Sequence, residues 1–153
     1  MLRLNRLVDY GIVLMSHIAA HPECRFSAPD LAHKLGLPTP AASKVLMGLA
    51  HDGLLTSYRG AKGGYSLARS ADAITVTDII SALDGPIALT DCIEDSDGTC
   101  DIESLCPIRG NWQIINDTVR RALSEIRLSD LTTPLPSFFK PPMAKDGKQI
   151  GTA

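Results

Sequence analysis

The sequence predicts a mainly α-helical fold with a small β-hairpin, namely a winged helix-turn-helix followed by a long C-terminal helix. Three observations predict it. Two short helical segments meet at a turn that contains glycine, a glycine-rich segment directly after them separates two strand-like runs, and a long amphipathic segment begins near residue 110. The chain has 153 residues and is 44% hydrophobic, which suits one compact domain with an appended element.

The first two helices are recognised by their ends. We expect the first to stop near His21-Pro22, because proline disfavours helical conformation in the residue before it. Ser27-x-x-Asp30 resembles a capping box, with Asp in place of Glu or Gln, and predicts the start of the second helix. Gly36 suits the end of that helix.

The third helix and the hairpin follow at once. Thr39 is the predicted N-cap, with Pro40 at the first helical position. The run "LLTSYRGAKGGYSLAR" then predicts two strands joined by a turn that carries Arg59 and Lys62. A hairpin with a basic tip directly after a recognition helix is typical of a winged helix.

This order of elements predicts binding to double-stranded DNA. A recognition helix places its N-terminal residues at base edges in the major groove, and a basic wing reaches phosphates or the minor groove. Residues 1–70 carry eight Lys/Arg against four Asp/Glu, and residues 71–153 carry seven against thirteen, although surface charge also varies without function. The predicted DNA-contacting residues are Thr39, Ser43, Lys44, Arg59, Gly60 and Lys62, with Gly60 serving the tight turn.

Four regions are expected along the chain. Residues 1–83 form the winged helix-turn-helix domain, residues 84–109 a cysteine-bearing sensor loop, residues 110–131 a dimerisation helix with a short following turn, and residues 132–153 a flexible tail. A short helix that starts at Thr77 and stops at Gly85 would close the first region.

The long helix is expected to pair with its symmetry mate. A palindromic DNA site needs two recognition helices about one DNA turn apart, which predicts a homodimer with the first helix also at the interface. Its apolar residues recur at helical spacing on one predicted face: Trp112, Ile115, Val119, Ala122, Leu123 and Ile126.

The sequence indicates a cytoplasmic protein without membrane contact. No apolar run approaches the roughly 18–20 residues needed to cross a bilayer, and the first residues do not form a signal peptide. A reducing cytosol disfavours structural disulfides, so clustered cysteines there indicate metal ligands or redox groups.

Cys92, Cys100 and Cys106 lie in an acidic segment with seven Asp/Glu and no Lys/Arg between residues 84 and 103. Their spacing differs from the Cys-x2-Cys knuckle of structural zinc sites. All four histidines lie in residues 17–51, so no base accompanies a catalytic cysteine and no enzyme is predicted. Longer loops between thiolates suit an iron–sulfur cluster, while zinc, a disulfide or a thiol redox role remain alternatives.

Taken together, these motifs resemble the Rrf-two family of winged-helix regulators, typified by the iron–sulfur regulator IscR and the nitric-oxide sensor NsrR. The resemblance covers nearly residues 2–131, from "LNRLVDYGIVLM" through "RGAKGGYSL" and the cysteine segment to the long helix. Within the family the chain is most similar to the regulator of the SUF iron–sulfur assembly operon. The resemblance implies a homodimer that binds promoter DNA and carries a cluster, 2Fe–2S or 4Fe–4S, on Cys92, Cys100 and Cys106.

The fourth ligand distinguishes two branches of the family. IscR-like members use a histidine three residues after the last cysteine, where this chain has Arg109, whose guanidinium stays protonated. NsrR-like members use an aspartate in an N-terminal "DYA" stretch, which corresponds to Asp9 in "VDYG". The resemblance therefore implies Asp9 from the partner subunit, and the alternative for Asp9 is an ordinary surface acid.

The implied function is a cluster-sensing repressor of iron–sulfur cluster assembly genes. Two alternatives remain. One is a cluster-free winged-helix regulator whose cysteines sense oxidants or bind zinc. The other is a small iron–sulfur carrier in which the helix-turn-helix is only scaffold.

Overall fold

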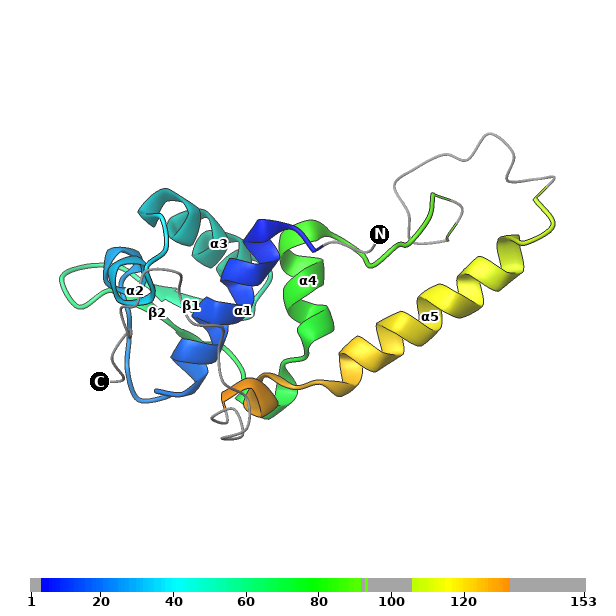
Figure 1. Ribbon diagram of the computed structural model, residues 1–153. Helices are drawn as coiled ribbons and strands as arrows, with labels where there is room; N and C mark the ends of the chain where they lie inside the picture. Colours follow the sequence, from blue (N-terminus) through cyan, green and yellow to red (C-terminus); the bar gives the residue numbers. More distant parts are fainter. Residues whose placement is uncertain (1–3, 92, 94–105, 133–153) are drawn as a thin grey trace, which may run out of the picture.

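The computed structural model describes residues 4–91, 93 and 106–132, and α5 extends away from the body formed by the other elements (Figure 1). The fold class expected from the sequence is confirmed, with helices as the main elements and a two-stranded antiparallel hairpin. None of the described helices has the length and apolarity needed to cross a bilayer. The elements are α1 (Arg6–Ala19), α2 (Ala28–Leu35), α3 (Thr39–His51), β1 (Leu55–Tyr58), β2 (Gly64–Leu67), the 3₁₀ helix η1 (Ala71–Ala73), α4 (Val76–Asp84), α5 (Arg109–Glu125) and the 3₁₀ helix η3 (Leu128–Thr132).

The ends of α2 follow the predicted chemistry with one difference. The Ser27 hydroxyl accepts a hydrogen bond from the backbone N–H of Asp30 at 3.2 Å, so Ser27 is the N-cap. The same hydroxyl donates to the Asp30 carboxylate at 2.5 Å, whereas in a full capping box the acid accepts from the backbone N–H of the cap residue. At the other end Gly36 takes a left-handed φ of 67°, and the N–H of Leu37 donates to the carbonyl of Ala32.

Two predicted helix starts are wrong by one or two residues. Pro38 is the N-cap of α3 and Thr39 its first residue, because the extended Pro38 already offers its carbonyl to the N–H of Ala42. The N-cap of α4 is Thr75 and not Thr77, because Thr75 forms a capping box with Asp78 in which both reciprocal hydrogen bonds are present.

The core is built around α1, which packs against α3 on one side and α4 on the other (Figure 1). Leu14, Met15 and Ile18 of α1 are completely buried. A Cβ on Gly11 would overlap the side chain of Leu83, and a Cβ on Gly48 would lie 3.3 Å from the same side chain. Leu83 of α4 therefore sits between a glycine of α1 and a glycine of α3.

The predicted apolar face of α5 is covered only in part by its own chain, and its pairing with a symmetry mate stays a prediction. Val119 and Leu123 are half-buried, but Ile115 is 45% exposed, and the fully buried residue is Asn116. The Asn116 side-chain oxygen accepts a hydrogen bond from the backbone N–H of Leu89 at 3.1 Å. Because α5 touches its own chain chiefly through α4 and the segment after it, most of its apolar surface stays uncovered.

A third segment pairs with the β-hairpin of the wing, and the sequence pattern does not reveal it. The strands β1 and β2 pair in the register Leu55 with Leu67 to Tyr58 with Gly64. On the other side of β2, Phe26 and Tyr65 exchange two backbone hydrogen bonds of 3.1 and 2.8 Å. The connector between α1 and α2 is thereby tied to the wing.

Gly64 allows the backbone of Phe26 to pair with Tyr65, and our first prediction concerns the substitution of Gly64. Gly64 has a φ of 140°, and a Cβ there would lie 2.7 Å from the carbonyl oxygen of Phe26. Gly64→Ala is expected to lower the free energy of unfolding by at least about 1 kcal/mol, through backbone strain and separation of the two segments. The matched control is Gly110→Ala, which meets no atom within 4 Å and should unfold at the wild-type denaturant concentration or slightly above it. Equal denaturant midpoints for wild type and Gly64→Ala would contradict the role of Gly64 in the close approach to Phe26.

Candidate nucleic-acid interface and cysteine segment

The outward face of α3 holds the predicted base-reading residues. Thr39 and Lys44 are exposed and Ser43 is half-buried, while the opposite face of the helix is completely buried in the core. Met47 lies on the same outward side with 59% of its surface exposed. Met47 is not among the residues predicted to contact DNA, but an exposed apolar side chain on a recognition helix suits contact with a thymine methyl group.

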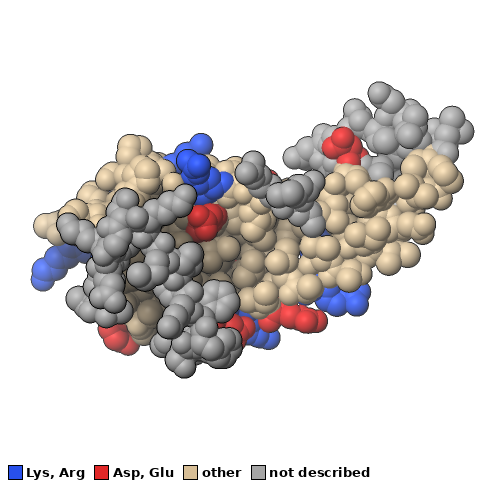
Figure 2. Space-filling view, in the orientation of Figure 1, with Lys and Arg blue, Asp and Glu red and all other residues tan. Residues whose placement is uncertain are grey.

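The turn of the wing presents Arg59, Gly60 and Lys62, all exposed. Gly60 has a φ of 96°, a conformation that favours glycine, so its role in the turn is conformational. The wing and α3 lie together at the end of the molecule away from α5 (Figure 1). Figure 2 shows Lys and Arg side chains standing out at this end in the same view.

These cations are not neutralised by the described carboxylates. In residues 4–91, 93 and 106–132 the ion pairs are His51 with Asp52 at 3.0 Å and Arg69 with Asp78 at 3.9 Å. Lys44, Arg59 and Lys62 belong to neither pair. Their charges are therefore available to an anionic partner such as a DNA backbone.

The cysteine segment leads into the start of α5. Cys106 is a half-buried free thiol three residues before Arg109, the first residue of α5. Ile93, next in sequence to Cys92, is buried. Cys92 and Cys100 lie outside the described residues, so their predicted role as ligands stays a prediction.

Asp9 lies in the first turn of α1 and is exposed. Figure 1 shows α1 and the start of α5 well apart within one chain. Within the part of the chain that the structure describes, no three His, Cys, Asp or Glu side chains gather in a way that could hold a metal ion.

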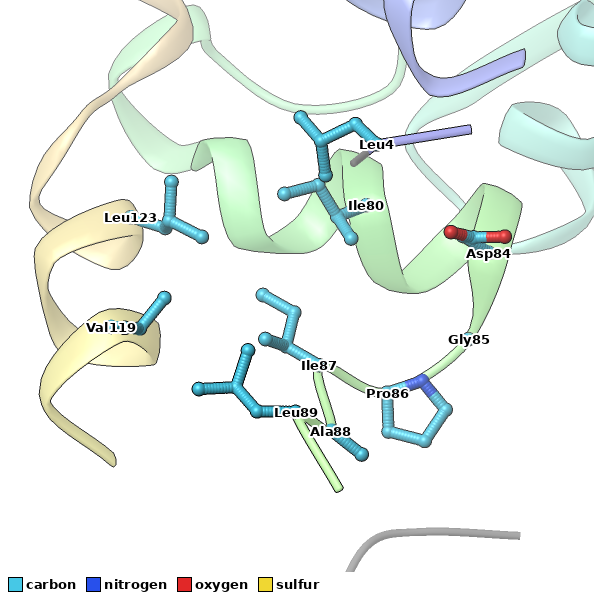
Figure 3. A pocket seen from close by; sticks show the side chains of 10 residues that line it. All are labelled: Leu4, Ile80, Asp84, Gly85, Pro86, Ile87, Ala88, Leu89, Val119 and Leu123. Atoms are coloured by element: carbon cyan, nitrogen blue, oxygen red, sulfur yellow. The ribbon is translucent and has the colours of Figure 1, made fainter. Parts of the chain in front are cut away.

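An apolar pocket of about 320 Å³ separates α4 from α5 (Figure 3). The side chains of Ile80, Ile87 and Leu123 point into it from α4, the following segment and α5. Its one charged lining residue is Asp84, whose carboxylate accepts a hydrogen bond from the Asn5 amide at 3.2 Å. The lining contains no paired nucleophile and base, so this pocket does not have the residues of a catalytic site.

Comparison with known proteins decides the family. The family model Rrf2, described as an iron-dependent transcriptional regulator, matches residues 4–134. The chain belongs to the Rrf2 family. It is a DNA-binding transcriptional regulator, and its relatives are regulators and not enzymes.

Two members of the Rrf2 family show how far the likeness extends. The regulator CymR of Bacillus subtilis is 34% identical over 125 residues, which are 81% of this chain and 85% of CymR. Its solved structure, described as the global cysteine regulator, superposes with a TM-score of 0.68 and covers 86% of this chain and 97% of CymR. The structure of T. potens IscR superposes with a TM-score of 0.65 at 29% identity and covers 85% of each chain.

A third solved structure is the oxidised form of CymR from Staphylococcus aureus. It is 28% identical to this chain, superposes with a TM-score of 0.67, and covers 89% of this chain and 100% of that protein.

The sequence patterns did not reveal the role of His17, which contacts the connector between α1 and α2. Its ring contacts those of His21 and Phe26, with centroids 4.6 and 5.2 Å away, and its Nε2 atom is buried without a hydrogen-bond partner. Burial, with smaller contributions from the charges of Lys34 and His21, lowers the pKa of His17 below its usual value of 6.5.

Our second prediction concerns the pH dependence of stability. Because the pKa of His17 is lowered by folding, the unfolded chain binds more protons between that pKa and about 6.5. The free energy of unfolding is therefore expected to be highest above about pH 6.5 and to fall as pH is lowered through this window. His17→Gln should remove this part of the pH dependence in denaturant titrations. His33→Gln, at an exposed position of α2, should retain the wild-type profile, and identical profiles for all three proteins would contradict the role of His17.

Proposed function

We propose that this protein is an iron–sulfur-cluster-sensing repressor of iron–sulfur cluster assembly genes that binds promoter DNA as a homodimer. The observation that carries the proposal is the position of the cysteine segment, which connects α4 of the DNA-binding body to the start of α5. Cys106, free and half-buried, is three residues from that helix. A change in the metal binding or oxidation of the cysteines therefore acts on the connection between the DNA-binding body and α5.

The donor set suits a cluster. Three thiolates, Cys92, Cys100 and Cys106, come from one segment, and soft thiolate ligands favour iron–sulfur clusters. Arg109 cannot replace the missing fourth ligand, because a guanidinium has no acceptor to offer a metal. The separation of α1 from the start of α5 within one chain supports the partner subunit's Asp9 as that ligand.

Exposed apolar residues on α5 support the dimer. Ile114 is 66% exposed, Ile115 45% and Ile126 39%. Large apolar side chains gathered on one exposed helix mark an interaction surface, and a symmetric partner helix covers them in an isologous contact. The proposed regions are therefore residues 1–83 for DNA, 84–109 for sensing, 110–131 for dimerisation and 132–153 as a tail.

The proposed change in DNA affinity on loss of the cluster requires little free energy. Cys92, Cys100 and Cys106 of one chain and Asp9 of the partner subunit would hold such a cluster, which would supply metal–ligand bonds sensitive to iron supply and oxidation. The residues of this chain then set the relative placement of the two α3 helices. A tenfold change in promoter affinity corresponds to a bias of about 1.4 kcal/mol between the two arrangements.

A cluster-free regulator is the second candidate. The observation that favours it is the free thiol of Cys106 together with the likeness to CymR, which has been solved in an oxidised form. In that case Cys92, Cys100 and Cys106 respond to oxidants directly or bind zinc.

The third prediction tests the DNA interface. Lys44→Ala and Arg59→Ala are each expected to weaken binding to a duplex selected by the wild-type protein from a random-sequence pool. A side chain that neutralises one phosphate contributes about 0.9 to the magnitude of the slope of log K against log salt, so Arg59→Ala, in the wing, should show a slope smaller by that amount. Lys44→Ala, at a predicted base-reading position, should instead relax the base preference of the protein. Arg121→Ala removes an equal charge from the exposed surface of α5 and should bind as wild type does. If Lys44→Ala and Arg59→Ala bind DNA as well as Arg121→Ala does, the placement of α3 and the wing against DNA is wrong.

The fourth prediction tests the cofactor. Protein purified without oxygen is expected to be brown, with visible absorbance and with iron and sulfide in stoichiometric amounts. Cys106→Ala should lose the cluster, and Asp9→Ala should change its spectrum and stability. Cys24→Ala and Asp91→Ala are the matched controls, because both residues are exposed and neither is an expected ligand. A colourless wild-type protein that contains zinc would favour the second candidate.

A further inference from the structure

Arg25 lies in the connector between α1 and α2, far from the wing in sequence but beside it in the fold. The next residue, Phe26, exchanges two backbone hydrogen bonds with Tyr65 of β2. The connector therefore runs along the edge of the hairpin like a short third strand. This pairing holds the backbone of Arg25 in register with the wing.

The side chain of Arg25 is held as well. Its guanidinium carbon lies 3.8 Å from the centroid of the Tyr58 ring, and Tyr58 is the last residue of β1, directly before Arg59. A cation over an aromatic face gains about 0.5–1 kcal/mol at an exposed site. The stacked guanidinium keeps its N–H donors at the edge of its plane, where they match the geometry of a phosphate.

The charge of Arg25 is not used within the described fold. Arg25 is exposed and forms neither of the two ion pairs found among the described residues. Two further uncompensated cations, Arg59 and Lys62, lie in the adjoining turn. An arginine that lies over an aromatic ring, with no partner among the described carboxylates, is ordered in advance for an anion.

We propose that Arg25 contacts a DNA phosphate beside the wing and that Tyr58 positions its guanidinium for this contact. This inference rests on the proposed function, in which the wing meets DNA. Arg25 extends the interface from the wing turn to the connector. Tyr58 is a positioning residue that acts through Arg25.

The test is the salt dependence of binding by the full-length protein to the same selected duplex. Arg25→Ala is expected to reduce the magnitude of the slope of log K against log salt by about 0.9, the value for one neutralised phosphate. Arg25→Lys keeps a cation and should keep the slope. Tyr58→Phe keeps the aromatic face and should bind as wild type does. Tyr58→Leu should weaken binding with the slope retained, because Arg25 is still present but less ordered.

The outcomes separate this inference from the function on which it rests. A purely structural role for the Arg25–Tyr58 stack predicts lower thermal stability in Arg25→Ala with the slope unchanged, which would overturn the proposal. If Arg59→Ala reduces the slope and Arg25→Ala does not, only the role of Arg25 fails. If neither variant changes the slope and Lys44→Ala binds as wild type does, the DNA interface itself is wrong.

Discussion

The packing of Leu83 against Gly11 and Gly48 is the constraint on which the rest of the structure depends. A Cβ at Gly11 would overlap the Leu83 side chain and a Cβ at Gly48 would crowd it, so α1 and α3 both approach α4 closely at the same side chain. Interiors packed at this density do not deform continuously. The orientation of the recognition helix is therefore fixed relative to α4, and Leu83 lies two residues before Gly85, where the chain leaves α4 for the cysteine segment.

The start of α4 is held by the far end of α5. The N–H of Val76 donates to the carbonyl of Ile126 at 3.0 Å, and the N–H of Leu128 donates to the carbonyl of Ile74 at 2.8 Å. Asn116 adds a hydrogen bond between the middle of α5 and the segment after α4. Because α4 packs against α3 and is also joined to α5, it connects the two ends of the molecule, as α1 does through its contacts with α3 and η3 (Figure 1).

The fold was largely predictable from the sequence because its signals are local. Glycine after a helix, a capping serine and a basic hairpin turn each depend on neighbours within a few residues. An error arose where two candidates compete within one turn, as with Thr75 and Thr77, because the capping box of Thr75 with Asp78 decides between them and the prediction did not weigh it. Asn116 was missed because periodicity searches for apolar residues, and Arg25 because its partner Tyr58 is distant in sequence. The ligand set is inferred from likeness, since two of its cysteines fall outside the described residues.

A comparison of two free energies favours a switch in which the DNA-binding body moves as a unit. Displacing a fully buried leucine of this body, such as Leu14 or Leu46, from its neighbours costs about 2–5 kcal/mol, judged by the cost of truncating buried leucines. A tenfold change in DNA affinity needs about 1.4 kcal/mol. Cluster loss at the proposed site is therefore expected to leave the packing of α1, α3 and α4 intact. The change is expected to fall on the connections to α5, at residues 85–91 and 126–128, where a few hydrogen bonds join the body to the helix that carries the proposed partner surface.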